Sequence, residues 1–70
     1  MGMTWDQIYF AACNAGFPNA VGSAEDNVND MVKEGHEPTD ALKFQSLETV
    51  LSFSEDKAEH AFFKSIGFKW

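Results

Sequence analysis

The hydrophobic positions of the chain recur with the period of an α-helix in four segments, and each segment is bounded by residues that start or stop helices. In the first segment Thr4 precedes Gln7 by three residues, which is the spacing of a capping box. Gly16 is placed to form a left-handed C-terminal cap, and Pro18 prevents the helix from continuing. We therefore predict a helix over residues 5–15, with Phe10 away from its apolar stripe.

The next two segments are bounded in the same way but differ in their apolar faces. Ser23 is the predicted N-cap of a helix over residues 24–34, which has a narrow apolar stripe and stops at Gly35. Thr39 or Asp40 starts the next helix, and its apolar positions cover more than half of the circumference. We expect such a helix to lie centrally among the others or to present a second face to a partner.

The fourth segment completes an all-α prediction. Ser54 is the predicted N-cap of this helix, and Ala58, Phe62 and Ile66 are its inward residues. No segment alternates as a half-buried strand would. The sequence thus predicts one small helical domain over residues 1–70, a compact bundle of three to four short helices at about 5–15, 24–34, 40–53 and 55–66.

The stretch "NAGFP" after the first predicted helix, with "GHEPTDALKF" at the start of the third, resembles the outline of ubiquitin-associated domains. Those domains are three-helix modules with a Gly-Phe loop after their first helix. The resemblance therefore implies a helical bundle with such a loop at Gly16 and Phe17. The span between Gly16 and Gly35 is longer than in that family, and a fourth predicted helix follows.

Composition and charge narrow the class of protein. The single Cys13 cannot form an intramolecular disulfide, which suits a reducing compartment, and we expect a cytoplasmic protein. The formal net charge is −6, and the chain contains no arginine. Binding to a phosphate backbone needs clustered lysine and arginine, so we expect no direct contact with nucleic acid. No apolar run is long enough to cross a bilayer, and we expect no membrane contact.

The negative charge is concentrated around the second predicted helix. Between residues 23 and 38, five carboxylates stand against the single cation Lys33. The helical period predicts an outward acidic surface formed by Glu25, Asp26, Asp30 and Glu34. We predict that this surface binds a larger protein that has a basic, nucleic-acid-binding surface.

Aromatic residues provide a second candidate surface. Phe62 lies in the inward stripe of the last helix, and Phe68 follows Gly67, where an apolar side chain often folds back on the last turn. Three aromatic residues have no place in the apolar stripes, and we predict that they contact a partner or form a homodimer: Phe10, Phe63 and Trp70.

The residues with potential for catalysis or metal binding form no recognisable constellation. Cys13 lies beside an apolar face, where a free cysteine acts as a small hydrophobe. The remaining candidates lack metal-ligand spacing and are interpreted as solvated surface residues: Glu34, His36, Glu37, Glu59 and His60. We therefore predict no enzyme activity, no catalytic or metal-binding residues and no cofactor.

These expectations favour a non-catalytic protein-binding module. Small acidic single-domain chains include phage-encoded inhibitors of host enzymes and defence complexes, such as anti-CRISPR proteins, and this chain is similar to them at the level of class. In that interpretation the acidic helix occludes a surface of the target. The alternative is a structural or assembly subunit, or a homodimer, that uses its exposed aromatic surface.

Overall fold

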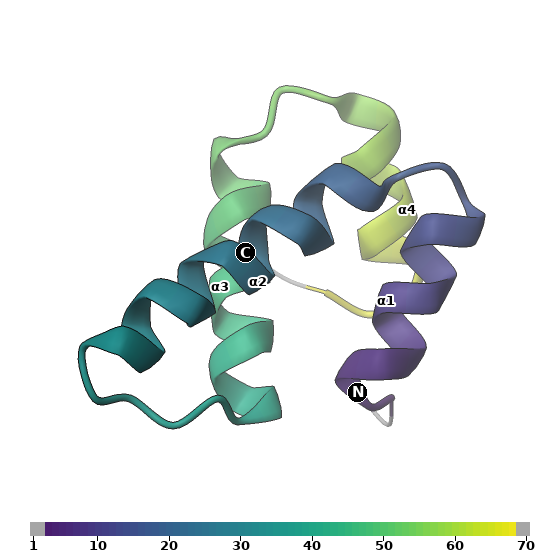
Figure 1. The fold of residues 1–70 in the computed structure, drawn as a ribbon. Coiled ribbons are helices and arrows are strands. Elements are labelled where there is room, and N and C mark those ends of the chain that lie inside the picture. Colours follow the sequence, from purple (N-terminus) through teal and green to yellow (C-terminus); the bar gives the residue numbers. More distant parts are fainter. Residues whose placement is uncertain (1–2, 69–70) are drawn as a thin grey trace.

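The computed structural model describes residues 3–68, which form four α-helices and no strand. They are α1 (Trp5–Asn14), α2 (Pro18–Lys33), α3 (Asp40–Phe53) and α4 (Lys57–Ser65). In Figure 1, α2 crosses in front of α3, and α1 and α4 lie towards the N-terminal end of α2. The predicted all-α bundle is confirmed. No described helix has the length and apolar character needed to cross a membrane.

Two helices begin at the N-caps that the sequence predicts. The Thr4 hydroxyl accepts a hydrogen bond from the Gln7 backbone N–H at 3.3 Å. The Gln7 side chain accepts one from the Thr4 N–H at 2.9 Å, which completes the capping box of α1. At the start of α3, the Thr39 hydroxyl accepts from the Leu42 N–H at 3.2 Å. Both caps satisfy backbone donors that have no partner within the helix.

The predicted start of the second helix at residue 24 is wrong, because α2 begins at Pro18. Proline lacks a backbone N–H and has its φ angle fixed near the helical value, so it suits the first turn of a helix. The chain thus leaves α1 at the Gly16 turn, and Pro18 is the first residue of the next helix. Ala20 and Val21 are buried, which places this extra turn on the core, and Ser23 lies within α2 and is not its N-cap.

The predicted start of the fourth helix is also wrong, by two residues. Asp56 is the N-cap of α4, since its carboxylate accepts from the Ala58 N–H at 3.0 Å and the Glu59 N–H at 3.2 Å. Ser54 instead follows the last residue of α3. Aspartate and serine are comparably good N-caps. The Ser54 hydroxyl instead donates to the Glu59 carboxylate and accepts from the Asp56 N–H.

Three helices end with the same backbone motif, as the glycine positions predict. Gly16, Gly35 and Gly67 have φ angles of 87°, 104° and 105°, a region that glycine enters without steric penalty. In each case the N–H of the following residue donates to a carbonyl five residues earlier, which is the Schellman arrangement. These bonds are Phe17 to Ala12 at 2.8 Å, His36 to Met31 at 3.0 Å and Phe68 to Phe63 at 3.1 Å.

The core is centred on aromatic rings at the end of the molecule where α1 and α4 meet the α2–α3 pair. Trp5 is buried and meets Phe44 edge to face, with ring centroids 5.8 Å apart. Phe68 folds back as predicted and meets Phe44 at 6.0 Å and Phe63 at 5.7 Å. Such edge contacts add to the gain from burying the rings. The aliphatic part of the core includes Ile8, Val21, Leu47 and Leu51.

The opposite end of the α2–α3 pair has a different character. Every residue from 32 to 41, which includes the connection between the two helices, is exposed. In Figure 1 this end extends to the lower left, away from α1 and α4. The distal part of the pair is thus held mainly by the contact between α2 and α3.

Candidate protein-binding surfaces

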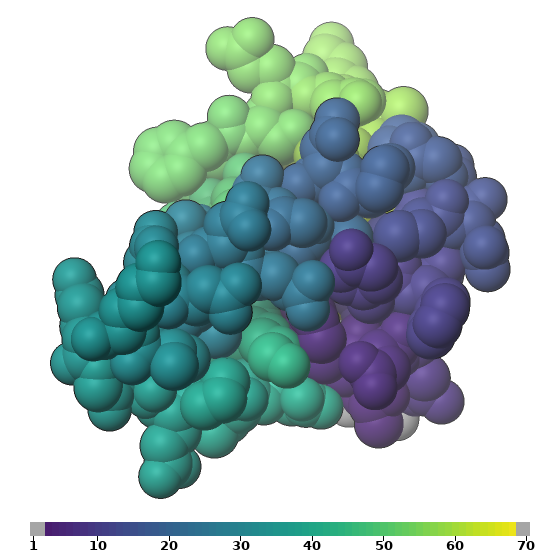
Figure 2. Space-filling view, viewed as in Figure 1, coloured from purple at the N-terminus to yellow at the C-terminus, as the bar shows by residue number. Residues whose placement is uncertain are grey.

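Helix α2 forms a continuous band across the face shown in Figure 2. A row of carboxylates follows the outer side of this helix. Asp26, Asp30 and the C-cap residue Glu34 are exposed and four residues apart, so they share one side of the helix. None of the three side-chain carboxylates makes a hydrogen bond or ion pair with a described residue. We call these three residues the acidic face. Lys33 is the only lysine of α2, so the negative charge is largely uncompensated.

Glu25 is not part of the acidic face, and its predicted outward placement is wrong. Its side chain is half-buried, and its carboxylate accepts a hydrogen bond from the Trp5 indole N–H at 3.2 Å. A buried indole needs such an acceptor. Glu25 therefore joins α2 to α1, and its direction differs from that of Asp26 by about 100° around the helix.

Phe63 is fully buried, so its prediction as an exposed partner-binding residue is wrong. The buried residues of α4 are Glu59 and Phe63, and the predicted inward residue Phe62 is only half-buried. The inward side of α4 is thus displaced by one residue from the prediction. The Schellman motif could have shown this, because it places the residue after the capping glycine against the residue five positions earlier, here Phe68 against Phe63.

Two aromatic side chains are strongly exposed. Phe10 is 68% exposed, so its predicted place off the core stripe is confirmed. Phe53 is 82% exposed and was not predicted as a site residue. It follows the buried Leu51 by two residues and so points about 200° away from it, a signal that the broad apolar face of α3 obscured. Trp70, the third predicted aromatic residue, lies outside the described residues.

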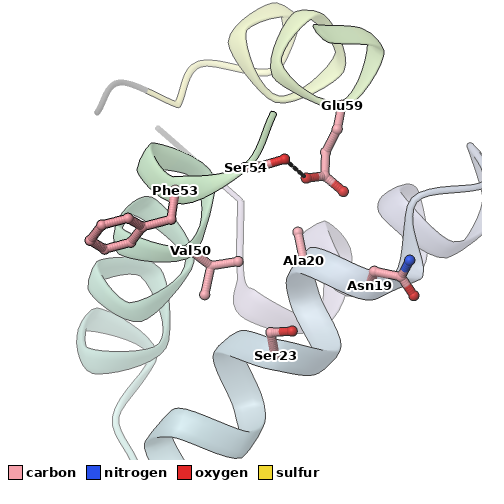
Figure 3. A pocket seen from close by; sticks show the side chains of 7 residues that line it. All are labelled: Asn19, Ala20, Ser23, Val50, Phe53, Ser54 and Glu59. Carbon is pink, nitrogen blue, oxygen red and sulfur yellow. Dashed lines mark hydrogen bonds between the residues drawn. The ribbon is translucent and has the colours of Figure 1, made fainter. Parts of the chain in front are cut away.

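An open groove, which we call the Glu59 groove, lies where the first turn of α4 faces α2 and the end of α3 (Figure 3). Its volume is about 350 Å³, and it is lined by Asn19, Ala20, Ser23, Val50, Phe53, Ser54 and Glu59. Glu59 is only 7% exposed, so its interpretation as a solvated surface residue is wrong. Its carboxylate accepts a hydrogen bond from the Ser54 hydroxyl at 2.8 Å and points from α4 towards Ala20 (Figure 3).

A second groove, which we call the Ser46 groove, lies between α2 and α3 nearer to their connection. Its volume is about 290 Å³, and it is lined by Asn27, Met31, His36, Leu42, Gln45, Ser46 and Thr49. Ser46 is 3% exposed, and its hydroxyl has no hydrogen-bond partner among the described residues. No carboxylate or lysine lines this groove, so its polar character comes from amides, hydroxyls and one imidazole.

The histidines and the cysteine lie apart from one another. His36 is exposed, as predicted, but His60 is half-buried, with Nε2 2.8 Å from the Leu51 carbonyl oxygen, so its interpretation as a solvated residue is wrong. Cys13 is exposed and does not pack as the small hydrophobe that the sequence predicted. Within residues 3–68, no three histidine, cysteine or acidic side chains are arranged to hold a metal ion.

Comparison with protein-family models, curated proteins and solved structures finds no match to this chain. The Gly-Phe turn that resembles ubiquitin-associated domains is present at Gly16 and Phe17, where it closes α1. The span that follows it is filled by the single helix α2, and α4 adds to the three helices of that outline.

Proposed function

We propose that this chain is a non-catalytic protein-binding module whose acidic face contacts a basic surface of a larger protein. The observation that carries the proposal is the row of exposed, unpaired carboxylates of Asp26, Asp30 and Glu34 along one helix. Clustered charge of one sign raises the rate of encounter with a surface of opposite sign and disfavours partners of like charge.

The proposed mechanism is occlusion. Proteins that bind nucleic acid present clustered lysine and arginine side chains, and these are the groups that an acidic helix attracts. A helix bound over them excludes nucleic acid by occupying its contacts. This mode of action suits a small phage-type inhibitor of a host enzyme or defence complex. It requires no chemistry and no cofactor from the chain itself.

The acidic face can be tested with the triple variant Asp26→Asn, Asp30→Asn and Glu34→Gln. These side chains are exposed and unpaired, so we expect the stability of the fold to change by no more than about 0.5 kcal/mol. Immobilised wild-type and variant chains are compared as baits in extract of the native host, and retained proteins are quantified by mass spectrometry. We expect a basic protein to be retained by the wild type and lost from the variant.

A matched control carries Asp6→Asn, Glu37→Gln and Glu55→Gln, which removes the same charge from exposed positions that are not part of the acidic face. The retained protein is then purified, and its binding to the wild type is measured against salt and against a competing oligonucleotide. Binding should weaken steeply as salt rises, and the oligonucleotide should compete. Equal retention of that protein by the two triple variants would contradict the proposal.

The exposed phenyl rings of Phe10 and Phe53 favour a second candidate, a homodimer or assembly subunit held by apolar contacts. Light scattering at micromolar concentration should then give about twice the 7.8 kDa mass of the chain. Phe10→Ala or Phe53→Ala should restore the monomer mass. A monomer mass for the wild type throughout the dilution series would exclude this candidate.

A further inference from the structure

Glu59 is a buried acid with no cation to balance it. The one hydrogen bond that its carboxylate makes with a described residue is donated by the Ser54 hydroxyl to Oε1, and no lysine or histidine within residues 3–68 forms an ion pair with this carboxylate. Buried charged groups in proteins are normally paired or bound to a metal, because removing a charge from water is costly. The position of Glu59 in the first turn of α4 compensates for part of this cost through the helix dipole.

The second carboxylate oxygen of Glu59 is reached from the groove. Within the described part of the chain, the Ser46 hydroxyl is the only side-chain polar atom that is both fully buried and without a partner. Oε2 of Glu59 has no partner, so it must keep some accessible surface, and the carboxylate points into the groove (Figure 3). A ligand atom in the groove can therefore contact it.

The other walls of the Glu59 groove suit a chain that is apolar along its length and positively charged at its tip. Ala20 and Val50 provide apolar surface beside the carboxylate. Asn19 and Ser23 add side-chain oxygens that can accept hydrogen bonds. Lysine and arginine side chains have this construction, with an aliphatic stem and a charged head. The volume of about 350 Å³ is sufficient for one such side chain.

The groove also adjoins the acidic face. Asn19, Ser23, Asp26 and Asp30 follow one another at intervals of four, three and four residues, so they lie along the same side of α2. A basic surface lying along the acidic face would therefore reach the Glu59 groove at the N-terminal end of that helix.

We infer that the Glu59 groove receives one lysine or arginine side chain of the partner, whose charged head pairs with Oε2 of Glu59. The identity of the partner as a basic protein rests on the proposed function above. Phe53 stands at the outer rim of the groove with its ring directed away from Glu59, where it can cover the neighbouring part of the partner's chain (Figure 3).

The groove can be tested without the native partner. The probes are short acetylated and amidated glycine peptides that contain one arginine or one lysine, and the matched ligand contains citrulline, which has nearly the shape of arginine but no charge. Each is titrated into ¹⁵N-labelled wild-type chain and followed by NMR. We expect saturable shifts at Ser54 and Glu59 with the cationic peptides and much smaller shifts with citrulline.

The decisive variant is Glu59→Gln, which removes the charge but keeps an acceptor for the Ser54 hydroxyl. Binding of the cationic peptide should weaken by about tenfold or more. Glu37→Gln is the matched control, because Glu37 is exposed in the α2–α3 connection at the opposite end of the pair. The Glu37→Gln variant should bind the cationic peptide as tightly as the wild type does. Circular dichroism verifies that each variant is folded. If Glu59→Gln does not fold, Ser54→Ala, which keeps the Glu59 charge, is used as the second variant.

Three results would overturn the inference. One is peptide binding that does not involve the Glu59 carboxylate. This would be seen as equal binding by Glu59→Gln and Glu37→Gln or, where Glu59→Gln does not fold, as tight binding by the folded Ser54→Ala variant that leaves the Glu59 amide unshifted. Another is shifts confined to the acidic face, which would leave the proposed function intact while excluding the groove. The third is a dimer that dissociates in the Phe53→Ala variant but does not dissociate when cationic peptides are added. The groove would then be occupied by a second copy of the chain.

Discussion

The two ends of the α2–α3 pair differ in how much apolar surface they bury, although the chain reverses by a Schellman motif at both ends. At the aromatic end, where α1 and α4 pack, Phe17 and Phe68 follow the capping glycines of those helices and contact the core. At the polar end, residues 32–41, His36 holds the equivalent position after Gly35 and is exposed. The backbone geometry is shared, and the residue after the glycine differs.

This difference separates two functions of one motif. The glycine reverses the chain, while the next side chain decides whether that reversal adds to the core. Apolar burial, and with it most of the stability, is therefore concentrated at the aromatic end. The polar end and the outer side of α2 are free to carry charge, which is the condition that the proposed acidic face requires.

The variant with the largest expected loss of stability is Phe63→Ala at the aromatic end. Phe63 is fully buried and meets the rings of Phe62 and Phe68, so its removal should cost about 3–5 kcal/mol. Domains of this size have only a few kcal/mol of net stability, so we expect a chain that is largely unfolded at 25 °C. Circular dichroism during thermal and urea unfolding measures the change.

Phe10→Ala is the matched control, because it deletes the same side chain from a position that is 68% exposed. Its midpoint of unfolding should stay close to that of the wild type. If the two variants lost similar amounts of stability, the concentration of stability at the aromatic end would be wrong.

A smaller effect of opposite sign is expected in the Ser46 groove, towards the polar end. Ser46→Ala removes a buried hydroxyl without a partner, and leaving such a group unsatisfied costs about 1–3 kcal/mol. We expect the variant to be more stable by about 1 kcal/mol, measured by urea unfolding. Ser52→Ala is the control, because Ser52 is exposed and its hydroxyl bonds to the Thr49 carbonyl, and its stability should change little. A loss of stability in Ser46→Ala would indicate that the hydroxyl has a partner after all.

The fold could be predicted where the signal is local. Thr4 with Gln7, Thr39, and the glycines 16, 35 and 67 fix helix ends through bonds within a few residues, and these predictions are confirmed. The start of α2 could not be predicted in this way, because Pro18 permits both the end of one helix and the start of another. Burial of Ala20 and Val21 against distant residues selects the longer helix.

The surfaces were harder to predict, because tertiary contacts select among equivalent candidates. Glu25 and Asp26 are adjacent acids, and only the position of the Trp5 indole makes the first of them structural. Phe62 and Phe63 are adjacent rings, and the return of Phe68 decides which is buried. The pair of Ser54 and Glu59 behind the Glu59 groove depends on the path of the short α3–α4 connection and on the choice of Asp56 rather than Ser54 as the N-cap of α4.

Trp5 also bears on the entropy of closing the chain. Its backbone N–H donates to the Asp40 carboxylate at 3.2 Å across a separation of 35 residues, and its indole reaches Glu25 across 20 residues. The entropy lost in closing a loop grows with the length of chain enclosed, so docking α1 on α3 closes a longer loop than pairing α3 with α2 across their short connection. Within residues 3–68, both long-range hydrogen bonds of α1 come from this one residue, which also makes an edge contact with Phe44. Trp5 thus adds directed long-range contacts to the burial of Ile8 and Ala12, and together they offset the entropy lost when the chain closes over α1.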